Sequence, residues 1–176
     1  MAHSLDVASY NRQGKVFCAA NTAAKSVIAV TTAMTGVILY NPAGSNRKLI
    51  IESCGWAWTT VPGAVHNIGI ALAPINATAP ATLTAIGSGV LAADGSGAAT
   101  TAVGRAYDAA TLAVAPVMAR LMFGAAWGTS VGVSPHALID HIDGAIILVP
   151  GATLTFAAVT TTAVGLGSVT WIEVPV

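Results

Sequence analysis

The sequence contains very few charged side chains. Only 8% of its 176 residues are charged, against about 25% in an ordinary soluble domain, and seven basic side chains balance seven acidic ones. A neutral surface without clustered Lys and Arg lacks the charge pattern that nucleic acid binding requires, so we expect no nucleic acid partner. Because 55% of the residues are hydrophobic and near-zero net charge promotes self-association, we expect a homo-oligomer that buries much of the surface.

The sequence also lacks long uninterrupted apolar runs. Residues 54–93 and 144–172 contain no Asp, Glu, Lys or Arg, but Pro, Gly, Thr, Ser or Asn interrupts both stretches every few residues. A membrane-spanning helix needs roughly 20 mainly apolar residues, which neither stretch supplies. Residues 1–7 have neither the basic start nor the apolar core of a secretion signal. We therefore expect neither a membrane partner nor export.

Cysteine is scarce as well. Cys18 and Cys54 are the only two cysteines in the sequence. Without export, two reduced and buried thiols are the simpler prediction, and a disulfide between them is the alternative. Two cysteines alone do not make a zinc site.

The sequence is rich in short runs of β-branched and aromatic residues separated by turn-forming residues. About ten such runs are present, at 16–19, 26–32, 36–40, 47–53, 65–73, 117–123, 128–133, 137–142, 144–149, 152–158 and 168–176. They predict an all-β fold, an antiparallel β-sandwich or jelly roll with long inter-strand loops. We expect a single domain at 15–176 and a polar N-terminal arm at 1–14 that becomes ordered on contact with a neighbour.

Two turns are predicted from residue type. The loop-forming residues 41–46 lie between two β-type runs, so residues 36–53 are expected to form a β-hairpin. Pro150 and Gly151 fit a type II turn, because Pro presets the first φ angle and Gly supplies the positive second one.

Two further predictions concern weaker patterns. Asp143 and Gly144 indicate a tight turn into the C-terminal strands. Residues 79–114 are rich in Ala, Thr, Gly and Ser, which predicts long connections with weaker strands. Within and just beyond them, residues 105–115 predict a short helix that Pro116 would end.

Residues 136–143 contain two histidines and two aspartates and were considered as a metal site. Strand side chains alternate between faces, so His141 and Asp143 would share one face, while His136 and Asp140 would share the other. Neither face collects the three ligands that a zinc site requires. We interpret these residues as polar groups at a strand end, with a metal or inter-subunit ion site as the alternative.

Two motifs match enzyme signatures without their structural context. Residues 128–132 (Gly-Thr-Ser-Val-Gly) fit a nucleophile elbow, with Ser130 as nucleophile and His141 as base of a hydrolase. The elbow needs a following helix, which Pro135 disfavours. Residues 41–48 lack the Gly-Lys-Ser/Thr ending of a phosphate-binding loop. We therefore predict no catalytic residue, no cofactor, no metal and no enzymatic activity.

The aromatic residues include four tryptophans, Trp56, Trp58, Trp127 and Trp171. Flat indole rings can stack on sugars, but they more often fill protein cores and subunit interfaces. We expect core or interface packing here, and sugar binding is the alternative.

Two segments resemble small structural proteins of tailed bacteriophages. Residues 37–51 are similar to a hairpin of these proteins in which the motif Asn-Pro-x-Gly-Ser connects two strands. Residues 143–156 with 169–175 are similar to their ending, in which a Pro-Gly turn precedes strands that close with aromatic-x-Glu-x-Pro. The resemblance implies a jelly-roll head decoration (cement) protein, usually trimeric, on the outside of the icosahedral capsid. It also implies the major capsid protein as partner and synthesis in the host cytoplasm.

On this interpretation the arm reaches a neighbouring subunit or the capsid shell, and apolar strand faces pack in the trimer. The residues expected at these interfaces are Leu5, Val7, Tyr10, Arg12, Trp56, Trp58 and Trp171. The alternative function is a carbohydrate- or receptor-binding module of a phage tail or fibre that uses its tryptophans.

Overall fold

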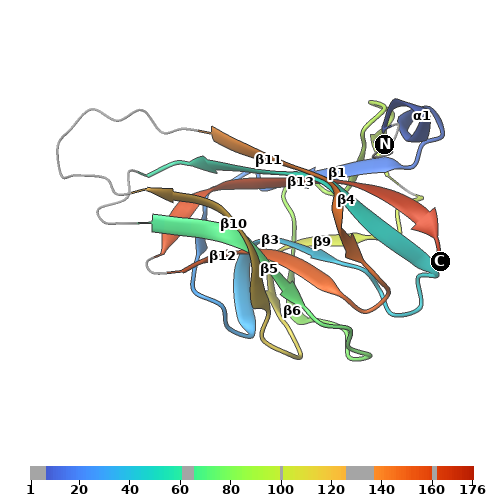
Figure 1. Cartoon of the computed structure of the whole chain (residues 1–176). Coiled ribbons are helices and arrows are strands. Elements are labelled where there is room, and N and C mark those ends of the chain that lie inside the picture. Colours follow the sequence, from blue (N-terminus) through green and yellow to red (C-terminus); the bar gives the residue numbers. More distant parts are fainter. Residues whose placement is uncertain (1–6, 61–65, 100, 126–136, 160–161) are drawn as a thin grey trace.

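The computed structural model describes residues 7–60, 66–99, 101–125, 137–159 and 162–176, which form two antiparallel β-sheets packed face to face (Figure 1). Sheet A contains, in spatial order, β11 (Ala137–Leu148), β4 (Arg47–Trp58), β13 (Ala163–Pro175), β1 (Val16–Ala20), β7 (Leu91–Ala92) and β8 (Gly97–Ala98), and β2 (Lys25–Val27) also pairs with β13. Sheet B contains β10 (Val117–Ala125), β5 (His66–Ala73), β12 (Thr153–Ala158), β3 (Ala33–Tyr40), β9 (Arg105–Thr111) and β6 (Ala81–Ala85). The predicted antiparallel β-sandwich is confirmed, whereas the jelly-roll connection pattern is not.

The main core lies between the two sheets and is supplied by alternate residues of their strands. Its largest fully buried side chains are Trp56, Trp171, Phe156, Leu39, Leu49, Ile51, Ile68, Ile70, Leu148 and Leu154. The C-terminal strand β13 lies between β4 and β1 in the middle of sheet A. The sequence-based expectation that this segment pairs inside a sheet is therefore confirmed.

Most predicted strands occur near their predicted positions, and the run at 128–133 lies outside the described residues. The Ala/Gly-rich region at 79–98 carries the short strands β6, β7 and β8, as expected for weak strands in long connections. The run at 26–32 contributes only the short strand β2.

The loop between β3 and β4 joins the two sheets, so the predicted hairpin at 36–53 is wrong. β3 pairs with β12 and β9 in sheet B, whereas β4 pairs with β11 and β13 in sheet A. The reason is the buried side chain of Asn41. Its amide nitrogen donates to the carbonyl oxygens of Arg47 (2.8 Å) and Leu148 (2.9 Å), and its Oδ1 accepts from the Ser45 hydroxyl (2.7 Å). These bonds fix a corner between the sheets.

The turn at Pro150 and Gly151 forms as predicted and makes the adjacent corner. Ala152 N donates to Val149 O (3.0 Å), and Gly151 has a φ of 88°, as a type II turn requires. The backbone N–H of Asn41 donates to Ala152 O (3.0 Å), and its carbonyl accepts from Gly151 N (2.7 Å). The two corners therefore form one hydrogen-bonded unit.

Residues 105–111 form the strand β9, so the predicted helix at 105–115 is wrong. The Ala-rich composition favours a helix by local propensity. However, Ala106, Asp108 and Ala110 are buried and alternate with more exposed residues, which is the period of a strand. Pairing with β3 and β6 overrides the local preference.

Asp143 and Gly144 lie inside β11, so the prediction that they reverse the chain is also wrong. Both residues have positive φ angles, of 50° and 77°. The pairing of β11 with β4 skips residues 142–145, which form an irregular bulge opposite Glu52. Figure 1 shows β11 curving from sheet A toward sheet B.

The N-terminal segment contains the helix α1 (Val7–Arg12), which contacts β1. The predicted arm at 1–14 is not confirmed, because residues 7–12 are helical and residues 1–6, including Leu5, lie outside the described residues. In the described parts of the chain, no helix is long and apolar enough to span a membrane.

Candidate functional site

The three tryptophans predicted at interfaces are buried inside the chain itself. Trp56, Trp58 and Trp171 are 1%, 4% and 0% exposed. Trp56 packs against Phe156 with ring centroids 5.9 Å apart, and Trp171 packs against Phe17 at 6.1 Å. Of the expected uses, core packing is the one observed; the placement of these three rings at an interface is wrong for the folded chain, and their burial also removes the sugar-binding alternative. Trp127 lies outside the described residues.

The predicted contact residues near the N-terminus lie together on α1. Val7 and Arg12 are exposed, and Tyr10 is half-buried. The tryptophans lie in the core, whereas these residues lie on α1, so the predicted residues do not form one site. Leu5 lies outside the described residues.

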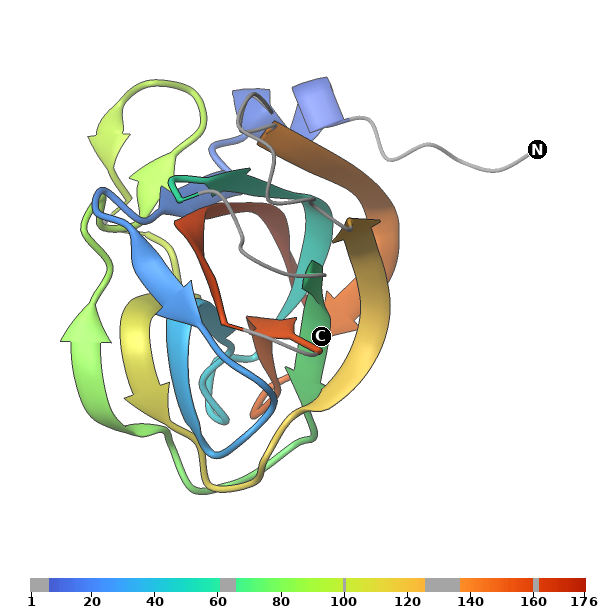
Figure 2. The same ribbon diagram turned by 90° about the vertical axis from the view of Figure 1, so that its left-hand side faces the viewer.

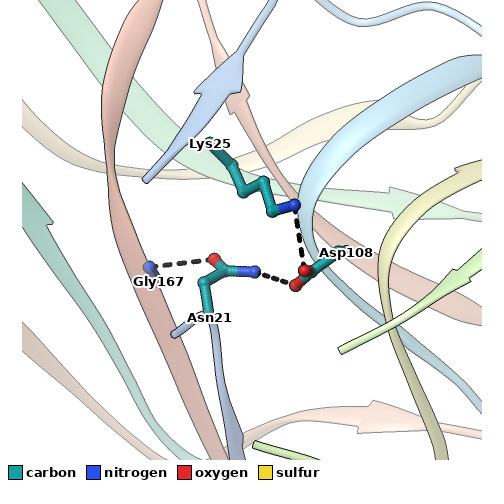
Figure 3. A network of polar contacts seen from close by, with 4 residues as sticks. All are labelled: Asn21, Lys25, Asp108 and Gly167. Atoms are coloured by element: carbon teal, nitrogen blue, oxygen red, sulfur yellow. Dashed lines mark hydrogen bonds and ion pairs between the residues drawn. The ribbon is translucent and has the colours of Figure 1, made fainter. Parts of the chain in front are cut away.

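A buried polar network joins the two sheets near β2 (Figure 3). Asp108 of β9 accepts a hydrogen bond from the side-chain amide of Asn21 and forms an ion pair with Lys25 of β2, at 3.0 Å. Asn21 Oδ1 accepts from the backbone N–H of Gly167 on β13 (3.1 Å). Because every polar group here has a partner within the chain, we interpret the network as structural.

Glu173 explains the aromatic-x-Glu pattern at the end of the sequence. Its buried carboxylate accepts hydrogen bonds from the backbone N–H groups of Val103 and Gly104, and from the indole N–H of Trp171 (3.2 Å). The bond to Gly104 measures 2.9 Å. Glu173 thus fixes the segment before β9 against sheet A, and these hydrogen bonds occupy its carboxylate.

The residues of the His/Asp-rich segment do not come together as a metal site. Asp140 is bound to Arg120, His141 and Asp143 are exposed, and His136 lies outside the described residues. Among the residues that the structure describes, no group of three or more His, Cys, Asp or Glu side chains is arranged to hold a metal ion. The elbow at 128–132 also lies outside them.

The cysteines offer no reactive centre. Cys18 and Cys54 are unpaired, as predicted. Burial raises the pKa of Cys54 to about 12, the nearby Asp140 carboxylate adds to this rise, and Arg120 opposes it. Burial also raises the pKa of the half-buried Cys18. Since the thiolate is the reactive form, both groups are poor nucleophiles at neutral pH.

The most distinctive surface feature is an open groove of about 330 Å³ between β10 and β11, here called the edge groove. It is lined by Arg120, Leu121, Met122, Leu138, Ile139 and Asp140. β10 is an edge strand of sheet B and β11 an edge strand of sheet A, and Figure 2 shows them side by side. Leu121 is 62% exposed and Ile139 is 68% exposed. Val117 of β10 and Ile147 of β11 are also large exposed apolar residues.

An ion pair crosses the edge groove and joins the two sheets. Arg120 Nε donates to Asp140 Oδ2 (2.7 Å), and its Nη2 donates to Oδ1 (2.9 Å). The hydrogen bonds to Asp140, and then its charge, raise the pKa of the Arg120 guanidinium. The two-point geometry fixes the orientation of both side chains. The groove thus combines the exposed apolar side chains of Leu121 and Ile139 with the paired charges of Arg120 and Asp140.

This composition suits contact with a protein more than catalysis. Solvent-exposed Leu and Ile around a neutralised ion pair provide area that is stabilising when buried, and no nucleophile–base pair lies among the lining residues. Sequence patterns placed Leu121 and Ile139 in strands but missed their exposure. That exposure depends on which strands become sheet edges.

Comparison of the chain with protein-family models, with curated proteins and with solved structures finds no match.

Proposed function

We propose that the chain is a non-enzymatic structural subunit of a phage virion, a decoration protein that forms a closed homotrimer on the outside of the capsid. The observation that carries this proposal is the edge groove: large apolar side chains are exposed on two edge strands of a chain with only 8% charged residues. Contacts repeated by symmetry would bury these side chains and shield the strand edges.

The two segments that resemble phage structural proteins support the proposal because they meet in space. Residues 37–51 contain the corner at Asn41, and residues 143–156 contain the corner at Gly151. Backbone and side-chain hydrogen bonds join the two corners. A likeness carried by one connected structural unit is stronger than a likeness carried by two unrelated stretches.

The strand order separates the surface expected to contact other copies from the surface expected to contact the capsid. The edge groove lies at β11, while α1 contacts β1, and β4 and β13 separate these two strands in sheet A. A trimer formed through the edge groove would leave the exposed Val7 and Arg12 of α1 free to contact the major capsid protein. Binding only to assembled shells would then stabilise the capsid through many weak repeated contacts.

The virion location is tested by antibody labelling of particles of the phage that encodes the chain. We expect label over the head surface, and we expect purified protein to rebind heads from which it has been stripped. Label on the tail, or absence of the chain from purified particles, would contradict the proposal.

The carbohydrate-binding alternative requires exposed tryptophan rings. Trp56 and Trp58 are buried, so their rings offer no face to a sugar. No other described feature favours this function over the structural one.

A further inference from the structure

Among the described residues, one buried carboxylate has an oxygen atom without a hydrogen-bond partner. Glu52 of β4 is only 7% exposed, and its Oε1 has no hydrogen-bond partner. The ion pairs among the described residues are Lys25–Asp108 and Arg120–Asp140, so neither involves Glu52. Buried polar groups are nearly always satisfied, and an unsatisfied one indicates a bound water, a bound ion or a functional role.

A second carboxylate lies across the strand pairing from this group, because Asp143 belongs to the part of β11 opposite Glu52. Burial raises the pKa of the Glu52 carboxyl, and the negative charge of Asp143 raises it further. Two carboxylates on facing strand segments, one of them more than nine-tenths buried and with an unpartnered oxygen, favour the approach of a positive charge.

The backbone of both strands is irregular at this point. Ser53 pairs with Thr170 and Ile51 with Trp171, so Glu52 is an extra residue relative to β13. On the other side, Glu52 faces residues 142–145, the bulge of β11. Carbonyl groups in a bulge are not all used in ladder pairing and can act as oxygen ligands.

We propose that Glu52 and Asp143 form a divalent cation site at the β11 bulge, with Ca²⁺ as the preferred ion. Oxygen ligands favour Ca²⁺ or Mg²⁺ over transition metals. Ca²⁺ accepts six to eight oxygens in flexible geometry, which two carboxylates, bulge carbonyls and water can provide. Mg²⁺ demands nearly ideal octahedral geometry and retains its water, so it should bind more weakly. This inference is independent of the proposed virion function.

The test measures the melting temperature of EDTA-treated protein with and without several millimolar CaCl2, against NaCl at equal ionic strength. For the wild type we expect CaCl2 to raise the melting temperature by about 5 °C at a hundredfold excess over the Kd. Titration calorimetry should give one Ca²⁺ per chain, and MgCl2 should give a smaller shift.

Two variants locate the site, and a third is the matched control. E52Q and D143N should abolish the CaCl2 shift. D143N keeps a residue type that tolerates the positive φ at this position, so it should fold. D94N removes the same charge from an exposed loop and should keep the full shift.

No shift in the wild type would overturn the proposal. So would equal shifts in D143N and D94N, which would indicate general charge screening or another site.

Discussion

At the scale of one residue, the buried side-chain amide of Asn41 fixes the corner at which the chain passes from one sheet to the other. It is 0% exposed and connects the β3–β4 corner with the β11–β12 corner. Removing its side chain would take one donor from the buried carbonyl of Leu148 and one from the half-buried carbonyl of Arg47, which also accepts from the Ser45 hydroxyl. Each unsatisfied group costs about 1–3 kcal/mol.

We therefore expect Asn41→Ala to lower the free energy of unfolding by about 2–4 kcal/mol in urea denaturation. Asn76→Ala is the control, because Asn76 accepts only one local bond, from the exposed Thr78 N. The control should lose less than about 1 kcal/mol. Equal losses in the two variants would mean that the corner bonds have no special role.

Glu52 gives a pH-dependent prediction. Its folded-state pKa is raised above the ordinary value of 4.5. Below that value the carboxyl is protonated in both states and has no effect on stability. As the pH rises, the unfolded chain ionises first, so stability is lost until the folded carboxyl has also ionised.

Glu52→Gln removes the ionisable carboxyl and therefore this loss of stability. In EDTA, the variant should gain stability relative to the wild type as the pH rises from about 4 to 7, and should show no gain below about pH 4. Chemical denaturation at several pH values measures this difference. A gain that is constant with pH would show that ionisation of Glu52 is not its cause.

At the scale of elements, β10 and β11 are long edge strands that meet at the edge groove. Burying Leu121 or Ile139, each more than 60% exposed, would contribute roughly 1–2 kcal/mol per residue. A double variant, Leu121→Asp with Ile139→Asp, should therefore shift the oligomer to monomer in sedimentation velocity experiments.

The same variant should keep its fold, since exposed substitutions usually change stability by about 0.5 kcal/mol or less. Ile75→Asp is the control, because Ile75 is 66% exposed but lies in the connection after β5. It should leave the oligomer intact. An oligomer that survives the double variant would place the interface elsewhere.

The elements also show where sequence reasoning succeeds and where it cannot. Residues 36–53 contain two real strands, but their assignment to different sheets depends on a bond from Asn41 to Leu148, which are 107 residues apart. The alternation of Ala106, Asp108 and Ala110 was present in the sequence, but Ala-rich composition concealed it. Asp143 and Gly144 were predicted to make a tight turn; both have positive φ angles, but such angles serve a bulge as well as a turn.

The candidate site was less predictable than the fold, for a physical reason. Exposure of Leu121 and Ile139 follows from the strand order of each sheet, which local patterns do not specify. The tryptophans were noticed for their size, and the same size makes them the natural core residues of the sandwich.

For the whole molecule, composition was the most reliable guide. Short runs of β-branched and aromatic residues between frequent turn signals predicted the β-sandwich. In the folded chain, ion pairs join the sheets at both sides: Lys25–Asp108 beside β2 and Arg120–Asp140 at the edge groove.

The most direct test of this account is the solution mass of the purified chain, measured by size-exclusion chromatography with light scattering. We predict a mass of about three times 17.5 kDa that persists on dilution, because the proposed trimer would bury the exposed apolar residues of the edge groove between copies. A stable monomer of 17.5 kDa would contradict the closed trimer and remove the main physical support for a decoration protein.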